Sequence, residues 1–504
     1  MLERLSLKSG VRRSRSSAAS ATNVGRAPFL LRIRSSTWFI ALAVSIGILV
    51  DLASYSLAVP VIPFRLERLH YHRVGDKTGY LVAAYAGGQI ASTPLVAYVG
   101  ARWRNRQVPL VVGLCSMIIA TIIFMEAKNF QLMIVARILQ GFSGTTLWCI
   151  GLALLADSVP EERIGSVLGV VLVGFPIGQA IGPPVGGALY DKFGYRAPFI
   201  FMLILVGVDL LLRLLMIEKH AALQYIRAGH YIPNFEAPGY VDPLTSSTSL
   251  HDLDGTVSKN NASVDDMALF DPDTVPLARA EMDQGPNDLK SQFIGYWHML
   301  QSPRAMTTIL LTLVNGFVAG GMQDTGLTLY LQHRYHMTSS GAGLVFLGLV
   351  IPVFFASPPA GWLSDKYGTK WVMLGGVVLS IPMFPLLIIK VSLPVFIVLL
   401  SVLGVAIASF VTPTTTDLAL VAAGSTSIKT AQIFGVFNLA YSVGALIGPV
   451  VAGGLLARLG VMHGWIALAG LSAGLTAMLV PPILIFVGGP LNWHRSDADK
   501  VPTV

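Results

Sequence analysis

Long apolar stretches separated by short polar breaks run through most of this 504-residue chain. A helix needs about 20 apolar residues to cross a bilayer, and twelve stretches meet that length. Six precede residue 218, near 37–60, 79–100, 108–126, 130–156, 167–189 and 197–217. Six follow residue 303, near 306–332, 341–361, 371–391, 394–420, 432–456 and 464–487. The pattern therefore predicts an all-α membrane protein with twelve transmembrane helices in two six-helix halves.

The segment between the two sets of spans has a different composition. It is poor in apolar residues and contains a run of aspartates that includes Asp252, Asp254, Asp265, Asp266, Asp271 and Asp273. Such a segment buries too little apolar surface to fold alone, so we expect a partly disordered linker. The expected domains are a disordered tail (1–36), a first half (37–217), the linker (218–303), a second half (304–487) and a second tail (488–504).

Composition excludes a soluble globular protein. Hydrophobic residues make up 53% of the chain and charged residues only 12%, far from the average of soluble domains. The formal net charge is +8, but the basic residues lie in the N-terminal tail and in loops beside the spans. This distribution is typical of a topology signal and not of nucleic-acid binding. We therefore expect a lipid bilayer as the environment and no nucleic-acid partner.

The same charges predict the orientation of the chain. An even number of spans places both termini on one side of the membrane, and eight Lys and Arg residues precede the first span. Arg102, Arg104 and Arg106 follow the second span, which favours a cytosolic location for both termini and the linker. The loop at 64–78 is also basic and argues for the reverse, but charges that flank the first helix usually dominate.

A glycine- and proline-rich stretch in the fifth span returns in the eleventh. The repeated positions are Gly178, Gly182 and Gly186 with Pro183, and Gly444 and Gly448 with Pro449. Glycines four residues apart form one bare helix face, on which another helix can pack backbone to backbone. The repeat indicates that the chain is a duplication whose halves surround a common axis.

The loop after the eighth span carries a second motif, Gly361-Trp-Leu-Ser-Asp365-Lys366-Tyr-Gly368-Thr-Lys370. With the six-plus-six arrangement, it resembles the major facilitator superfamily. The resemblance implies a fold of two six-helix halves and a conformational latch formed by Asp365 and its neighbours. The matching loop after the second span has Ala101 where the family has its acid, so the resemblance implies a weaker latch there.

Two further motifs resemble the proton-coupled branches of that superfamily. Span 4 contains Arg137-Ile-Leu-Gln140-Gly141, similar to a motif with an intramembrane arginine, and the Gly-Pro stretch of span 5 is similar to the motif of antiporters. Within the drug:proton antiporters the chain resembles the vesicular amine transporters, because Asp51 of span 1 and Asp324 of span 7 fall where that subgroup has carboxylates. Gln89 of span 2 also matches.

The chain departs from the vesicular amine transporters at one pair of positions. Where that subgroup pairs a lysine of span 2 with an aspartate of span 11, this chain has Tyr85 and Asn438. Both charges are missing together, so a neutral hydrogen bond could join these helices instead. The resemblance implies that these residues belong to the substrate and proton-coupling site.

Ionisable groups in the spans are the candidate functional residues, because each costs about 2.5–3.5 kcal/mol in the membrane unless it faces a partner or a cavity. They are Asp51, Arg137, Asp209, Arg213, Asp324 and Asp417. For Asp51 and Asp324 we expect substrate binding or proton exchange, against the alternative of a structural hydrogen bond.

The other candidates have stronger structural alternatives. Asp209 and Arg213 are four residues apart and are expected to pair along one helix. Arg137 lies near a helix start, where it could reach the surface instead of a partner. Asp417 follows Pro413, whose ring frees backbone carbonyls that could line a cavity, and both interpretations stay open.

The leading hypothesis is a proton-coupled antiporter that exports small cationic or amphipathic molecules by alternating access. The alternatives are a symporter that takes up a nutrient and a transporter-like receptor or scaffold. No nucleophile–base set, phosphate-binding loop or metal-ligand spacing occurs in the sequence, so we expect neither an enzyme nor a cofactor or metal. We expect a monomer, in a plasma membrane in preference to a vacuolar or vesicular one.

Overall fold

The computed structural model describes residues 28–103, 105–159, 167, 170–227, 301–423 and 430–488. Within these ranges the chain is helical and contains no strand, so the predicted all-α class is confirmed. Most of the expected linker and tails lies outside the described residues. The first residues of the expected linker form a short helix, α10.

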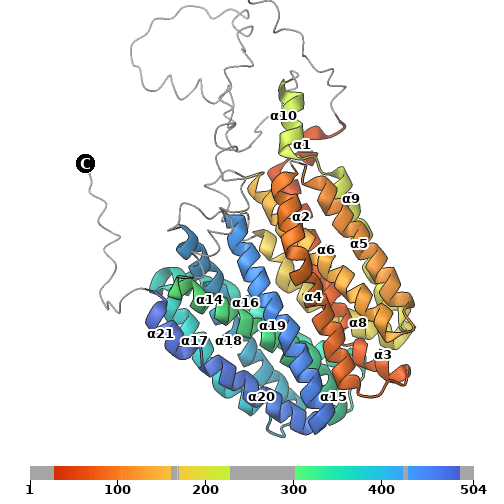
Figure 1. Ribbon diagram of the computed structural model, residues 1–504, viewed down its shortest axis with the longest axis vertical. Helices are drawn as coiled ribbons and strands as arrows, with labels where there is room; N and C mark the ends of the chain where they lie inside the picture. Colours follow the sequence, from red (N-terminus) through yellow and green to blue (C-terminus); the bar gives the residue numbers. More distant parts are fainter. Residues whose placement is uncertain are drawn as a thin grey trace, which may run out of the picture.

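The helices come in two sets, one on each side of the linker (Figure 1). The first set is α1 (Leu31–Arg34), α2 (Thr37–Ala58), α3 (Ile62–Arg68), α4 (Val74–Arg102), α5 (Gln107–Glu126), α6 (Phe130–Ala156), α8 (Gly174–Phe193), α9 (Arg196–Leu215) and α10 (Lys219–Arg227). The second set is α14 (Pro303–Phe317), the π-helix η2 (Val318–Leu327), α15 (Thr328–Tyr335), α16 (Ser339–Tyr367), α17 (Thr369–Leu386), α18 (Leu393–Ala423), α19 (Thr430–Leu459), α20 (Val461–Ala477) and α21 (Val480–Phe486).

Polar side chains explain where several helices begin. The capping residues are Ser36 before α2, Asn129 before α6, Ser302 before α14 and Thr338 before α16. Each accepts a hydrogen bond from a backbone N–H of the first turn, which otherwise has no intrahelical partner.

Eleven helical stretches among the described residues are long and apolar enough to cross a membrane, and they correspond to eleven of the twelve predicted spans. The predicted second span is α4, which has 29 residues but carries Asp76, Lys77 and Gln89 and is more polar. It packs between α6 of its own half and α19 of the other half. Polar side chains are tolerated there because much of α4 faces protein and not lipid.

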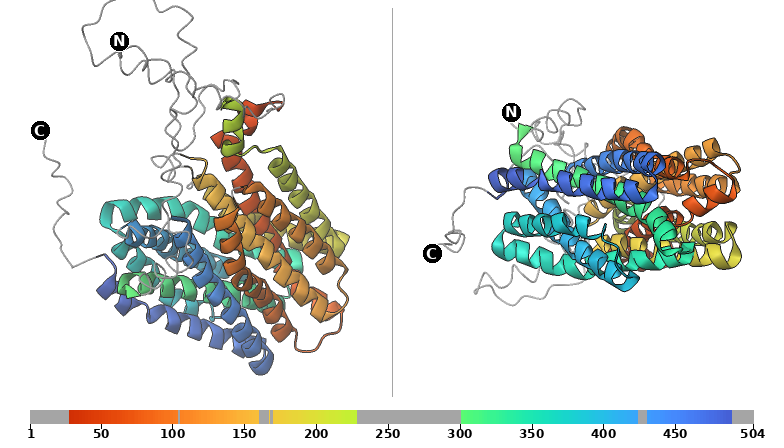
Figure 2. Two further views of the ribbon diagram at one scale, coloured as in Figure 1. Left: turned by 45° about the horizontal axis from the view of Figure 1, so that its top comes forward. Right: turned by 90° about the horizontal axis from the view of Figure 1, so that it is seen from below.

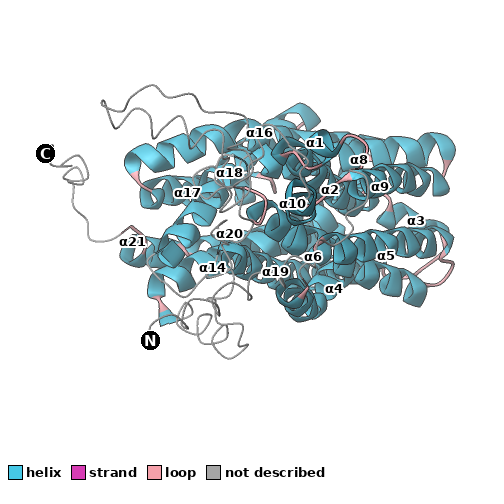
Figure 3. Cartoon of the chain, turned by 90° about the horizontal axis from the view of Figure 1, so that it is seen from above, coloured by secondary structure: helices cyan, strands magenta, loops and turns pink. Residues whose placement is uncertain are grey.

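The helices form two bundles that lie side by side (Figures 1 and 3). The first half contains residues 37–215 and the second contains residues 303–486, and Figure 2 shows their contact from two further directions. The halves meet through two pairs of helices, α4 with α19 and α8 with α16. We call the end where α9 stops and α14 starts the linker end, and the end where α2 stops and α4 starts the opposite end.

The repeated glycine face packs inside each half. A Cβ atom on these glycines would overlap the helix beside it: Gly178 with the Leu49 carbonyl, Gly182 with the Ser56 hydroxyl, Gly186 with the Leu57 carbonyl, Gly444 with the Leu313 carbonyl and Gly448 with the Phe317 carbonyl. The first three contacts are to α2 and the last two are to α14. The predicted bare face is therefore present in both halves, and it joins span 5 to span 1 and span 11 to span 7.

A neighbouring face of α8 and of α19 packs against a helix of the other half. The facing positions are Pro183 with Gly343, Gly187 with Ser339, Pro449 with Gly79 and Gly453 with Gly75. In each pair a carbonyl of one half lies where a Cβ on the other half's glycine would be. These four contacts, which we call the opposite-end seam, hold the two halves close at the opposite end.

Hydrogen bonds reinforce the opposite-end seam. The Ser339 hydroxyl donates to the Pro60 carbonyl (2.9 Å), and the Ser340 backbone N–H donates to the Asp191 carboxylate (2.8 Å). The Gln332 amide donates to the Glu67 carboxylate (2.7 Å). In the described part of the chain, no hydrogen bond joins the two halves at the linker end. Among the described residues, the close contacts and hydrogen bonds at the two ends of the bundle therefore join the halves at the opposite end.

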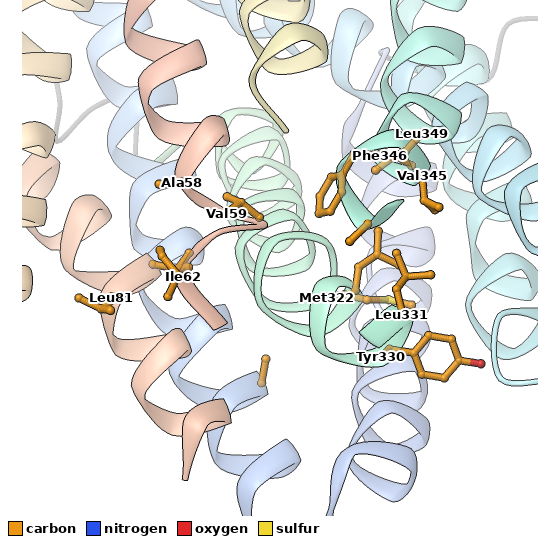
Figure 4. Close-up of a cluster of buried hydrophobic side chains, with 14 of the residues drawn as sticks. Ala58, Val59, Ile62, Leu81, Met322, Tyr330, Leu331, Val345, Phe346 and Leu349 are labelled. Atoms are coloured by element: carbon orange, nitrogen blue, oxygen red, sulfur yellow. The ribbon is translucent and has the colours of Figure 1, made fainter. Parts of the chain in front are cut away.

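A shared hydrophobic core supports this arrangement. Figure 4 shows residues of both halves in it, with Ala58 and Ile62 from the first half and Met322 and Phe346 from the second, all buried. Large apolar side chains on the outside of the bundles are exposed instead, as expected where lipid is the solvent. Ile204 of α9, for example, is 61% exposed.

Candidate functional site

Asp51 lies in the middle of α2 and is 4% exposed. Its Oδ1 accepts a hydrogen bond from the Tyr85 hydroxyl of α4 (3.0 Å). Gly144 of α6 lies against this pair, and a Cβ atom on Gly144 would be 2.7 Å from Asp51 Oδ1. The absence of a side chain at Gly144 thus makes room for a carboxylate–phenol pair inside the first half.

Asp324 lies in the second half, on the π-helix η2 that continues α14, and is also buried. Its Oδ2 accepts a hydrogen bond from the Tyr55 hydroxyl (2.5 Å). Tyr55 belongs to α2, so this hydrogen bond crosses from one half to the other. Short π-helical segments interrupt a regular helix at some cost and are frequent at functional sites.

The two carboxylate–tyrosine pairs touch through their rings. The ring centroids of Tyr55 and Tyr85 are 4.7 Å apart, within the range of direct aromatic packing. Asp51 and Asp324 are therefore joined by two phenols in contact.

Arg137 lies beside the two pairs and is fully buried, so it does not reach the surface as the structural alternative required. Its Nη1 donates to the Gln140 side chain (3.1 Å), and its guanidinium carbon is 5.7 Å from the centre of the Tyr55 ring. Its Nε and Nη2 have no hydrogen-bond partner among the described residues. A buried cation with free donors places positive charge next to the carboxylates.

Gln89 provides a further polar link between the halves. Its Oε1 accepts a hydrogen bond from the Ser442 hydroxyl of α19 (3.0 Å). Asn438 is one turn earlier on the same helix, 9% exposed. Its amide nitrogen has no hydrogen-bond partner among the described residues.

The suggested hydrogen bond between Tyr85 and Asn438 does not occur in the structure. The helices that carry them, α4 and α19, do pack together, but the Tyr85 hydroxyl donates to Asp51. A carboxylate is a stronger acceptor than a carboxamide, which explains this choice of partner.

Asp417 lies apart from this cluster. Both its carboxylate oxygens accept from Arg304 Nε at 3.1 Å, and Oδ1 also accepts from the Thr369 hydroxyl (2.8 Å). Arg304 is near the start of α14 and Thr369 starts α17, so the group lies at the linker end of the second half. It connects three helices of one half and does not contact Asp51 or Asp324.

The loop motif after span 8 is also at the linker end. Gly368 ends α16 and precedes α17 with φ of 87°, a conformation that favours glycine. Gly361 lies one turn before Asp365 and faces α18 at Thr412. Lys366 Nζ is 4.9 Å from the centre of the Trp362 ring.

Asp365 is exposed and makes no ion pair or hydrogen bond within the described part of the chain. The proposed latch is therefore not engaged among these residues in this structure. The structure also describes no group of three or more His, Cys, Asp or Glu side chains that could hold a metal ion.

Sequence reasoning missed some of these partners. Tyr55 is four residues after Asp51, and this spacing could have suggested a shared helix face. Ser442 and Arg304 are ordinary helix residues, and no sequence pattern indicates their contacts. They became visible only when the helices were placed in space.

Two bundles of membrane-length helices around buried, paired carboxylates define a multi-pass membrane transporter. The family model described as the Major Facilitator Superfamily matches residues 44–333 and 308–503. The chain belongs to this superfamily, and it is a transporter and not an enzyme.

Curated relatives agree with this assignment. The MFS-type transporter ppzB of Metarhizium rileyi is 26% identical over 459 residues, which cover 86% of this chain and 92% of the relative. An uncharacterized MFS-type transporter of Schizosaccharomyces pombe is 26% identical over 438 residues, covering 83% of this chain and 90% of that protein. The human synaptic vesicular amine transporter is 30% identical over 143 residues, 28% of each chain. The predicted resemblance to vesicular amine transporters is thus confirmed, at low identity.

Solved structures share the fold. A bacterial homolog of the human lysosomal transporter Spinster, in an inward-facing and unoccupied conformation, matches with a TM-score of 0.63 at 13% identity, covering 92% of this chain and 100% of that one. The nucleoside transporter NupG matches with a TM-score of 0.56 at 13% identity, covering 88% of this chain and 98% of that one. These matches support the twelve-helix fold.

Proposed function

We propose that this transporter is a proton-coupled antiporter that exports small organic cations or amphipathic compounds by alternating access. The observation that carries this proposal is the pair of buried carboxylates, Asp51 and Asp324, each held by a tyrosine hydroxyl. A buried carboxylate is stabilised when a proton or a cation neutralises it. Asp51 and Asp324 are linked through the contact between their tyrosine partners. This arrangement suits the exchange of a proton for a substrate cation.

The two carboxylates receive different roles in this proposal. Asp51 is bonded inside its own half and binds the positive group or polar handle of the substrate. Asp324 is bonded across the halves and exchanges the coupling proton, so that its protonation state is linked to the contact between halves. Tyr85, Gln89 and Asn438 contribute polar groups to the same site.

The cations and acids outside the two carboxylate–tyrosine pairs have supporting roles. Arg137 adds positive charge beside Tyr55, the hydrogen-bond partner of Asp324. Asp417 acts at the linker end, through Arg304 and Thr369.

Alternating access uses the two ends of the bundle in turn. In the structure the opposite-end seam is closed, and Asp365 has no partner within the described residues. We infer that closure of the linker end engages Asp365, with Lys366 and the turn at Gly368, while the opposite-end seam opens. The glycine faces of α8 and α19 permit this motion because they keep helices close without interlocking side chains.

The setting in the cell follows from the charge distribution. We propose that both termini and the linker are cytosolic, with the halves at 37–217 and 304–487 as the moving units. Export then means transport toward the opposite end, across the plasma membrane, by a monomer. Accessibility of single cysteines introduced at Arg32 and at Arg73, which lie at different ends of the bundle, tests the orientation in intact cells.

The antiport proposal is tested with the purified chain in proteoliposomes that carry an imposed pH gradient. The probes are ethidium, tetraphenylphosphonium and tyramine, three organic cations of different shape. We expect at least one probe to accumulate in vesicles with an acidic lumen and to leave when a protonophore is added. Accumulation in vesicles with an alkaline lumen would show symport, and a lack of pH-dependent movement for all three would overturn the proposal.

A further inference from the structure

Asp209 and Arg213 form a buried charged pair that the carboxylate–tyrosine cluster does not use. Both residues lie on α9 and both are 0% exposed. Arg213 Nε is 3.4 Å from Asp209 Oδ1. Both carboxylate oxygens and all three guanidinium nitrogens lack a hydrogen-bond partner in the described part of the chain. Buried polar groups are nearly always hydrogen-bonded, and water is a small ligand that can donate to the carboxylate and accept from the guanidinium.

The pair faces α2 at a position where that helix has no side chain. A Cβ at Gly47 would overlap Arg213 Nη2 and would lie 3.1 Å from Asp209 Oδ2. Gly47 precedes Asp51 by four residues, so the two lie on the same face of α2 about 6 Å apart along its axis. The charged pair is therefore one helical turn from Asp51, on its linker side.

Polar contacts continue from the pair toward the linker end. The Arg213 backbone carbonyl accepts from the Gln107 amide (2.7 Å), and the Gln107 backbone N–H donates to Glu218 Oε1 (2.5 Å). Gln107 starts α5, and Glu218 follows the end of α9. Asp51, the Asp209–Arg213 pair, Gln107 and Glu218 thus form a column of polar groups within the first half.

Among its described residues, the second half has no such column. Where the Gln107 side chain of α5 donates to the Arg213 carbonyl in the first half, Lys370 Nζ of α17 donates to the Leu484 carbonyl of α21 in the second (2.7 Å). Between α14, α17 and α21, the space that corresponds to the charged pair contains the apolar side chains of Leu311, Met373 and Ile483. Because one half closes this space without charges, the fold itself does not need them.

We propose that Asp209 and Arg213 hold a hydrated proton site that connects Asp51 to the linker end of the first half. A proton leaves the Asp51 carboxyl for a bridging water, which passes a proton to the Asp209 carboxylate. Asp209 then releases it through water past Gln107 to Glu218, and Arg213 stays protonated throughout. The inference deepens the proposed antiport and rests on it: Asp51 holds a proton when it holds no substrate, in addition to the proton exchanged at Asp324. Asp209 and Arg213 are positioning and relay residues outside the substrate site.

Few other charges act on this site. The helices packed against α9 are α2, α5 and α8. The ionisable groups of α2 are Asp51 and Tyr55, and the Tyr55 hydroxyl donates to Asp324. Glu126 of α5, and Tyr190, Asp191 and Lys192 of α8, lie at the opposite end of their helices. Cys115 of α5 is exposed on the outside of the bundle. A change at Asp209 therefore acts on Asp51 without a competing neighbour.

Time-resolved infrared spectroscopy after a pH jump tests the relay without a substrate. The reporter is the carbonyl stretch of protonated Asp51, identified as the band that Asp51→Asn removes in the full-length protein. We expect Asp209→Asn to slow the rise of this band at least tenfold. A double variant, Asp209→Leu with Arg213→Leu, should slow it equally, and should fold because well-packed apolar residues often replace a buried ion pair without loss of stability.

The matched control is Glu126→Gln with Arg196→Gln, which removes an exposed ion pair between α5 and the start of α9 and should leave the rate unchanged. An unchanged rate in Asp209→Asn would overturn the relay, as would the lack of any band lost in Asp51→Asn. If the double variant does not fold, the rate of the Asp51 band in Asp209→Asn is the test of the relay. Failure of antiport in the wild type would remove the proposed function but would leave this rate measurable.

Discussion

The two halves of this transporter have the same packing but different charges. The glycines of α8 and α19 contact α2 and α14 in the same way, and the four contacts of the opposite-end seam are repeated between the halves. The buried charges are not repeated. Asp51 bonds within its half and Asp324 bonds across the halves, and the Asp209–Arg213 site has an apolar counterpart.

We infer that the repeated packing serves the movement of the halves, whereas the unrepeated charges serve substrate binding and proton transfer. Packing that is equal in both halves gives a symmetric hinge, in which either end can close with similar contacts. Charges that differ between the halves can set the direction of transport, because the substrate and the proton then bind in different environments. We infer that the first half holds the substrate and conducts a proton from Asp51 to the linker end, and that the second half exchanges the coupling proton at Asp324.

The largest effect is expected from the two carboxylates. Asp51→Asn removes the charge that binds the substrate and should abolish concentrative transport in proteoliposomes with a pH gradient. Asp324→Asn should retain substrate exchange between equal concentrations but lose accumulation, since only the proton step is removed. Glu126→Gln, an exposed acid, is the control and should behave as wild type. Wild-type accumulation by both carboxylate variants would show that coupling runs elsewhere.

The shared packing is tested by glycine substitutions in both halves. Gly182→Leu and Gly448→Leu should each block transport, because the new side chain overlaps Ser56 or Phe317 and overpacking costs about 1–3 kcal/mol. Gly207→Leu is the control, since nothing lies within 4 Å of a Cβ there. Thermal unfolding and transport rates measure both effects. Full activity of the Gly182 variant would show that this face is not a helix contact.

The two tyrosines should differ in the kind of effect they have. Tyr55→Phe removes the hydrogen bond that crosses the halves, whereas Tyr85→Phe removes one inside the first half. A hydrogen bond to a charged group contributes about 1.5–3 kcal/mol, so each change should alter transport by about tenfold or more. Only Tyr55→Phe should change the rate at which the halves rearrange, measured by fluorescence from dyes on both halves. The control is Tyr80→Phe, a residue on α4 that is 48% exposed.

The smallest effect is expected at the linker-end loops. Asp365→Asn should lower the transport rate about two- to fivefold without loss of membrane expression, because one charge near a helix end contributes about 0.3–1 kcal/mol. Ala101→Asp, at the matching position of the first half, should change the rate less. Normal rates in Asp365→Asn would remove the latch from the mechanism, and an equal effect of both changes would contradict the asymmetry between halves.

Much of the architecture was determined by the sequence alone. Runs of apolar residues long enough to cross a bilayer predict the helices and their number, because lipid requires every backbone polar group to be bonded within its own helix. The repeat of Gly178 and Gly182 at Gly444 and Gly448 predicts a duplication and a close helix contact, since a bare face has few other uses. Asp51 and Asp324 are conspicuous for the cost of burying a charge in the membrane.

Only the tertiary structure decided which groups are partners. It showed that Tyr85 bonds Asp51 and not Asn438, that Tyr55 reaches across to Asp324, and that Asp417 pairs with Arg304 far from both. A hydrogen bond between helices depends on their relative rotation and depth to within a fraction of an ångström. Local composition carries no such information, because the register of two helices is set by the packing of all their neighbours.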